Sequence, residues 1–100
     1  MHERIKNNSL KWPRNLANAI NEHTKCIDNN ISITAVEAKY LLERAKLDDV
    51  RAKDIIYMYF KDDYTLKIIG SKYLISSNRV RQIISHSLFV MKRAYNELFK

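Results

Sequence analysis

The sequence is poor in the residues that interrupt helices and in those that cross-link a chain. It contains one glycine and one proline among its 100 residues. Because these two residue types mark turns, bulges and strand ends, their scarcity favours long helices over an all-β chain. The single cysteine, Cys26, has no partner for an intramolecular disulfide, and no apolar run is long enough to span a bilayer. We therefore expect an all-α protein, a small helical domain of about four or five helices, that makes no contact with a membrane.

Residues 1–10 are polar and lack the apolar core of a signal peptide. Together with the lone cysteine, this composition predicts a protein of the reducing cytoplasm. The chain length suits one small core. We expect residues 1–48 to form an N-terminal helical annex with a flexible leader, and residues 49–100 to form the unit that carries the function.

Positive charge is concentrated in the second half of the chain. Residues 1–49 carry eight basic and seven acidic side chains, whereas residues 50–100 carry ten basic and four acidic ones. Such a concentration is typical of proteins that bind a polyanion. The alternative is a basic surface that interacts only with solvent.

Hydrophobic periodicity and capping residues predict three helices in the first sixty residues. The first helix has Pro13 at its first position and extends to about residue 25. The second begins at a capping box formed by Thr34 and Glu37, and ends near residue 46. The third is capped by Asp48 or Asp49. The side chains expected on the buried faces of the second and third helices are Val36, Tyr40, Leu41, Ile55, Ile56, Tyr59 and Phe60. Residues 31–33 alternate as a short strand would.

The C-terminal half has the pattern of a helix-turn-helix. Thr65 begins a short helix that ends near residue 72, and Ser76 is placed to cap a long amphipathic helix at about residues 77–95. A small residue is needed where the two helices cross, and Gly70 supplies it. The side chains that we expect to be buried together are Ile56, Ile69, Val80, Ile83 and Leu88.

The residues of this pattern match a known family without a gap. Thr65-Leu66-x-x-Ile69-Gly70, followed by Ile75-Ser76-x-x-Arg79-Val80-Arg81-Gln82-Ile83, resembles region four of bacterial sigma factors. The resemblance covers about residues 50–93. It implies recognition of double-stranded promoter DNA, with the second helix in the major groove, and binding to RNA polymerase. Because one such helix has a small footprint, RNA polymerase or a second copy of the chain, as a homodimer, is the expected additional partner.

The resemblance also implies which residues contact DNA. Base contacts fall at Ser77, Asn78, Arg81 and Gln82, and a phosphate contact at Arg79. Arginine can pair bidentately with guanine and glutamine with adenine, which agrees with these roles. Further DNA-binding candidates are Ser85 and His86 along the same helix, and Lys67 and Lys72 on the short helix.

Three positions depart from the family pattern. The family usually has Arg-Glu at Ser77-Asn78, a glycine at Leu74 in the turn, and a glutamate at Ile84. The first departure supports an alternative function, a protein-interaction module that mimics region four and binds RNA polymerase or a regulator without reading DNA. Nothing in residues 1–48 resembles the sigma region that melts promoter DNA, so we do not expect a complete sigma factor.

Other functional interpretations are less favoured. Lys92, Arg93 and Lys100 are expected near the C-terminus of the long helix, where the helix dipole favours cations. The helical spacing of the aromatic residues favours packing over base stacking. His23 and Cys26 are three residues apart, but two ligands do not make a structural zinc site. We expect no metal, no cofactor and no enzymatic activity, because no catalytic arrangement or phosphate-binding loop is present in the sequence.

Overall fold

The computed structural model describes residues 11–24 and 32–99. The expected leader, Cys26 and Ile31 lie outside these ranges. The described residues form five α-helices and a π-helical turn, which confirms the all-α prediction. In chain order they are α2 (Arg14–Thr24), α3 (Ala35–Arg44), α4 (Ala52–Ile56), the π-helical turn η1 (Tyr57–Lys61), α5 (Leu66–Tyr73) and α6 (Ser77–Phe99). None of these helices is both long and apolar enough to cross a membrane.

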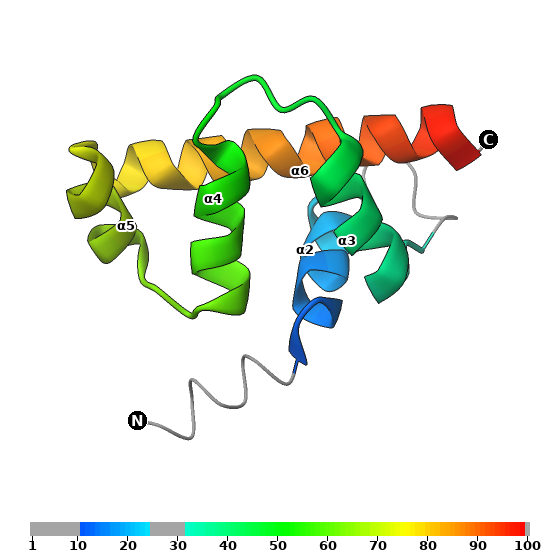
Figure 1. The fold of residues 1–100 in the computed structure, drawn as a ribbon, viewed down its shortest axis with the longest axis horizontal. Coiled ribbons are helices and arrows are strands. Elements are labelled where there is room, and N and C mark those ends of the chain that lie inside the picture. The colour runs from blue at the N-terminus through cyan, green and yellow to red at the C-terminus, as the bar shows by residue number, and fades with distance from the viewer. Residues whose placement is uncertain (1–10, 25–31, 100) are drawn as a thin grey trace.

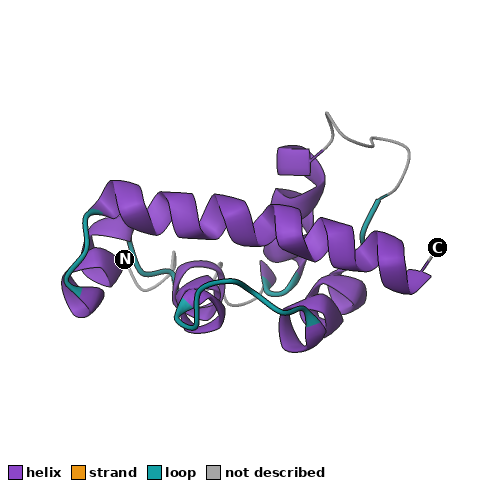
Figure 2. Cartoon of the chain, turned by 90° about the horizontal axis from the view of Figure 1, so that it is seen from above, coloured by secondary structure: helices purple, strands orange, loops and turns teal. Residues whose placement is uncertain are grey.

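Helix α6 spans the length of the molecule, and the other helices are arranged along it (Figure 1). Helix α5 packs at the N-terminal end of α6, α4 packs further along its N-terminal half, and α2 and α3 pack on its C-terminal half. Figure 2 shows α6 from above, running along the molecule; α2 and α3 also pack against each other. The second half of the chain therefore supplies a long support on which the first half packs.

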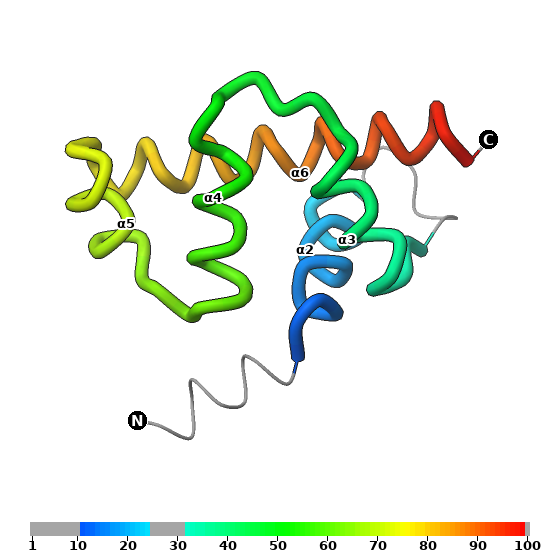
Figure 3. The backbone as a smooth tube through the Cα atoms, viewed as in Figure 1, coloured from blue at the N-terminus to red at the C-terminus, as the bar shows by residue number. Residues whose placement is uncertain are grey.

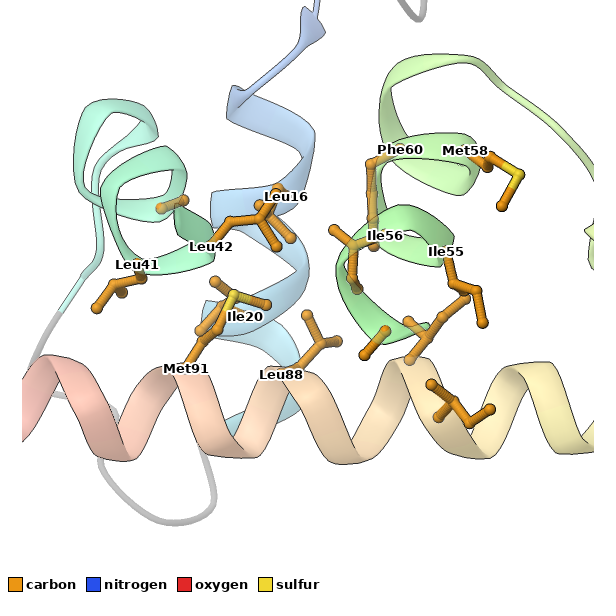
Figure 4. Packing of buried hydrophobic residues seen from close by; sticks show 14 of the residues in the cluster. Leu16, Ile20, Leu41, Leu42, Ile55, Ile56, Met58, Phe60, Leu88 and Met91 are labelled. Carbon is orange, nitrogen blue, oxygen red and sulfur yellow. The ribbon is translucent and has the colours of Figure 1, made fainter. Parts of the chain in front are cut away.

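The hydrophobic core is continuous along this support. Figure 4 shows Ile20 of α2 beside Met91 of α6, Leu16 of α2 near Leu42 of α3, and Ile55 and Ile56 of α4 on the N-terminal side of Leu88. All five side chains that the sequence analysis expected to be buried together, Ile56, Ile69, Val80, Ile83 and Leu88, are in the core. Burying each such side chain contributes about 1.5–3 kcal/mol relative to exposure.

The start of α3 is as predicted, but only part of its predicted buried face is. Thr34 and Glu37 form the reciprocal capping box. Val36 is 79% exposed, however, and Tyr40 is also exposed. Leu41 is buried as predicted, and Ala38 and Leu42 complete the core side. The prediction gave most weight to the larger side chains, whereas the small Ala38 allows the close approach of α3 to its neighbours.

Residues 32–34 are loop, so the alternating pattern does not form a strand in the described part of this segment. Ile33 is buried in the core. The Asn21 side chain accepts a hydrogen bond from the Ile33 N–H at 2.8 Å and donates one to its carbonyl at 3.0 Å. This side chain satisfies the backbone groups that a neighbouring strand would otherwise pair.

The third helix also differs from the prediction. Asp49 accepts from the Arg51 N–H, but the residue before α4 is Arg51, which makes no side-chain cap. After Ile56 the helix widens into η1, where the Asp62 N–H bonds to the Tyr57 carbonyl. A π-helical turn shifts the helical register. Met58 and Phe60 are therefore buried, and Tyr59 is exposed.

Glu43 connects α3 to the segment that follows it. Its carboxylate accepts from Lys53 Nζ at 2.9 Å and from the Tyr57 hydroxyl. Burial, with a further contribution from Glu43, raises the pKa of Tyr57 to about 12. The neutral phenol is thus favoured in the folded state, and its contribution to stability is lost as pH rises from about 10 to about 12.

We predict that Tyr57→Phe reduces the alkaline loss of stability. The melting temperature of the wild type should fall by several degrees between about pH 8 and about pH 11, and less in the variant, because phenylalanine has no proton to lose. Some loss remains, since burial also raises the pKa of Tyr73. Circular dichroism measures the effect, with the exposed Tyr64→Phe as control. An equal fall in Tyr57→Phe and the wild type contradicts it.

Candidate nucleic-acid interface

Helices α5 and α6 each begin at a side-chain cap. The Thr65 hydroxyl accepts from the Ile68 N–H at 3.2 Å, and the Ser76 hydroxyl accepts from the Arg79 N–H at 3.0 Å. Both helix starts were predicted from the sequence. The caps fix the residues at which α5 and α6 begin. The first residues of α6 lie at one end of the molecule, next to α5 (Figure 3).

The turn between these helices adopts a left-handed conformation at Leu74. Its φ is 60° and its ψ is 41°, and its side chain is 90% exposed. The Ile75 N–H bonds to the Gly70 carbonyl at 2.9 Å, which closes the end of α5. The departure from glycine at this position therefore leaves the turn shape intact and costs about 1–2 kcal/mol of backbone strain.

Gly70 makes a close approach, but not to the side of α6. A Cβ atom at this position would lie 2.5 Å from the Ile75 carbonyl oxygen and 3.4 Å from the backbone of Ser76 and Ser77. Gly70 therefore packs against the turn and the first residue of α6. It does not lie at a crossing of α5 with a later part of α6, which was the prediction. Glycine is required here because a backbone carbonyl occupies the space of a side chain.

The candidate DNA-binding residues of α6 lie at its N-terminal end. Ser77, Asn78, Arg79, Arg81 and Gln82 are all exposed. Asn78, Gln82 and His86 follow one another at steps of four and share a face of the helix. Val80 and Ile83 lie on the buried side and hold this part of α6 against the core.

The remaining candidates lie around this group. His86 is exposed and Ser85 is half-buried, both about one turn beyond Gln82. Lys67 and Lys72 are exposed on α5. Ile68 of the same helix is exposed as well, although it belongs to an apolar pattern. The structure thus brings most of the candidates to one end of the molecule.

Two side-chain contacts organise the exposed residues of α6. Arg81 Nη2 donates to Asn78 Oδ1. Arg79 Nη1 donates to Gln82 Oε1 at 3.5 Å. Each contact joins residues three apart on one helix. The two guanidinium groups are therefore partly ordered by neighbouring amides.

A pair of aspartates from the α3–α4 loop borders this surface. Asp48 Oδ2 lies 2.5 Å from His86 Nε2. Asp49 accepts from Arg51 Nε at 2.9 Å and from Nη2 at 2.7 Å, and these bonds, with the Arg51 N–H, lower the pKa of Asp49 to about 2. A cavity of about 310 Å³ separates this loop from α6. Its lining residues are Asp48, Asp49, Arg79, Gln82, Ile83, His86 and Ser87.

Asp48 was not expected at this surface. Local spacing, the only signal that a single sequence offers, placed Asp48 or Asp49 at the cap of a helix. The contact with His86 spans 38 residues. It follows from the packing of the α3–α4 loop along α6, which no local pattern specifies.

The basic residues near the end of the chain also differ from expectation. Helix α6 continues from Arg93 to Phe99, so Lys92 and Arg93 are not in its last turn. The helix dipole acts mainly within that turn and does not account for them. Lys92 is only 2% exposed, whereas Arg93 is exposed. Lys100 lies outside the described residues.

Residues 45–93 match the family model described as Sigma-70, region 4. They are a sigma-70 region 4 domain. No curated protein and no solved structure matches the chain. Region 4 domains are non-catalytic DNA-binding modules that bind promoter DNA and RNA polymerase. The region 4 domain here comprises the α3–α4 loop, α4, η1, α5 and α6 as far as Arg93, which gives the chain a role related to transcription.

We predict that Gly70→Val destabilises the domain by about 1–3 kcal/mol, since its Cβ must displace the Ile75 carbonyl. Urea unfolding followed by circular dichroism measures the change. Ser71→Val, one residue further along on the exposed side of α5, introduces the same β-branched side chain without the clash. Equal stability losses in the two variants would show that helix propensity, rather than the close approach, sets the cost.

The strain at Leu74 predicts the opposite effect. Leu74→Gly should stabilise the domain by about 1 kcal/mol, because glycine adopts the left-handed conformation without a steric penalty and the exposed leucine contributes little packing. Leu74→Ala keeps the Cβ atom and should give no such gain. A loss of stability in Leu74→Gly, measured by the same unfolding assay, contradicts this account.

Proposed function

We propose that this protein is a sequence-specific DNA-binding transcription regulator whose α6 reads the major groove of duplex DNA. The observation that supports this proposal best is the cluster of exposed polar side chains on the first turns of α6, which are backed by the buried Val80 and Ile83. The N-terminal turns of a second helix enter the groove in helix-turn-helix proteins generally. The region 4 match supports the same arrangement.

The chemistry of each side chain suggests its role. Arg81 and Gln82 are proposed to contact bases, since a guanidinium pairs with guanine and an amide with adenine. Arg79 is proposed to contact phosphate, together with Lys67 and Lys72 of α5, because cations on the flanks of a reading helix fix its position on the duplex. Ser77, Asn78 and Ser85 would add polar contacts along the same face.

Asn78 has a second role in this proposal. Its carbonyl oxygen accepts a hydrogen bond from Arg81, so the Arg81 fork has fewer conformations to lose when it meets a base. The family usually has an acidic residue at this position. Replacing it with a neutral amide removes a negative charge from the face and is expected to change the preferred promoter sequence.

The N-terminal annex would serve this surface indirectly. We propose that residues 1–48 act as an annex whose α2 and α3 hold the second half of α6. A single reading helix has a small footprint, so RNA polymerase or a second copy of the chain is the proposed partner for tight binding.

A second candidate function is favoured by the Ser77-Asn78 departure. In that case the protein is an interaction module that binds RNA polymerase or a regulator in the manner of region 4 and does not read DNA. The retained Arg79, Arg81 and Gln82 favour DNA reading. The two functions differ in whether single side chains of α6 change the choice of DNA sequence.

Two substitutions test the proposal. We predict that Arg81→Ala weakens binding to the preferred duplex by about 1–3 kcal/mol and relaxes selection at one base pair. Arg79→Ala should instead weaken binding to all sequences alike and reduce the salt dependence by about one unit. Fluorescence anisotropy on a selected and a scrambled duplex, with and without RNA polymerase, measures both effects. If the wild type and Arg81→Ala bind the two duplexes equally while polymerase binding persists, the interaction module is the correct function.

A further inference from the structure

His86 extends the proposed reading face beyond Gln82, and its side chain contacts an acidic residue of another segment. Its Nε2 lies 2.5 Å from Asp48 Oδ2, in a contact between α6 and the α3–α4 loop. The two side chains are 59% and 73% exposed. The pair is therefore open to a duplex that docks on the first turns of α6.

The contact determines which ring nitrogen a phosphate can meet. An ionised carboxylate only accepts hydrogen bonds, so His86 Nε2 must carry the proton that it donates to Asp48. In the neutral imidazole the other nitrogen, Nδ1, then holds a lone pair and accepts. A phosphate oxygen also only accepts, so neutral His86 offers it no donor at Nδ1. A second proton on the ring turns Nδ1 into a charged donor.

We propose that Asp48 is a positioning residue for His86, and that the His86 contact with DNA phosphate requires the uptake of one proton. This inference rests on the proposed DNA-reading function of α6. With neutral His86 the pair carries a net charge of −1, and with protonated His86 it carries none. Proton uptake thus supplies a donor and removes a negative charge from the surface that faces the phosphates.

The other charged groups that line the cavity between the loop and α6 are Asp48, Asp49 and Arg79. Asp49 is held ionised by Arg51, which lowers its pKa to about 2. The other histidine among the described residues, His23 of α2, lies against the Phe89 ring with 4.8 Å between ring centroids. His23 is therefore a matched control away from the Asp48 carboxylate.

The test is the pH dependence of DNA affinity at constant ionic strength. Wild-type affinity for the selected duplex should increase about tenfold from about pH 8 to about pH 5.5. His86→Gln should remove most of this increase, because its amide donates at every pH, and His23→Gln should retain it. Asp48→Asn should bind more tightly than the wild type at about pH 8 and depend less on pH, since the negative charge is gone and Nε2 no longer must carry the proton.

A second measurement follows the proton directly. The nuclear magnetic resonance titration of the His86 ring should shift upward by about one pH unit when the duplex is bound, because proton uptake and DNA binding are reciprocal. An unchanged titration, or a pH dependence that persists in His86→Gln, overturns the inference while leaving sequence selection intact. If the wild type does not distinguish the selected from the scrambled duplex at either pH, the proposed function fails and this inference fails with it.

Discussion

The burial of one stripe of α6 is the interaction on which the rest of the structure depends. Val80, Ile83, Leu88 and Met91 lie on this stripe, and α2, α3, α4 and α5 all contact the helix that carries it. Those helices have between 5 and 11 residues, too few for a helix to be stable alone in water. They are stabilised by packing against α6. The opposite face of the first turns of α6 is exposed. One amphipathic helix therefore supplies both the buried stripe and the proposed reading surface.

Two parts of the chain hold α6 in place, and they come from different regions of the sequence. The region 4 match ends at Arg93, but α6 continues to Phe99, and α2 and α3 pack on its second half. Glu43 also bonds to Lys53 and Tyr57, which joins α3 to α4 and η1. The first turns of α6 are thus presented by a helix that is supported along its length, which favours a fixed geometry toward a duplex.

Local rules predicted the features that are determined locally. The side-chain caps at Thr34, Thr65 and Ser76 join residues three apart, and the three helix starts that they mark were predicted from the sequence. Leu74 stands where the family usually has glycine, and it adopts the left-handed conformation. The errors came from long-range packing and from irregular helix geometry. Ala38, rather than the larger Val36 or Tyr40, lies on the buried face of α3. The register shift in η1 buries Met58 and leaves Tyr59 exposed. The Asp48–His86 contact depends on the path of a loop, which a single sequence does not encode in any short pattern.

The central claim is that the first turns of α6 meet duplex DNA, and backbone chemical shifts test it most directly. Labelled protein would be titrated with a duplex enriched from a random pool, and amide shifts recorded along the chain. The account predicts that the largest changes cluster at residues 77–86 of α6 and at the exposed side of α5, with little change at Val36 and Tyr40 of α3. Changes confined to α3 and the last turns of α6, or no saturable change with any enriched duplex, would contradict it.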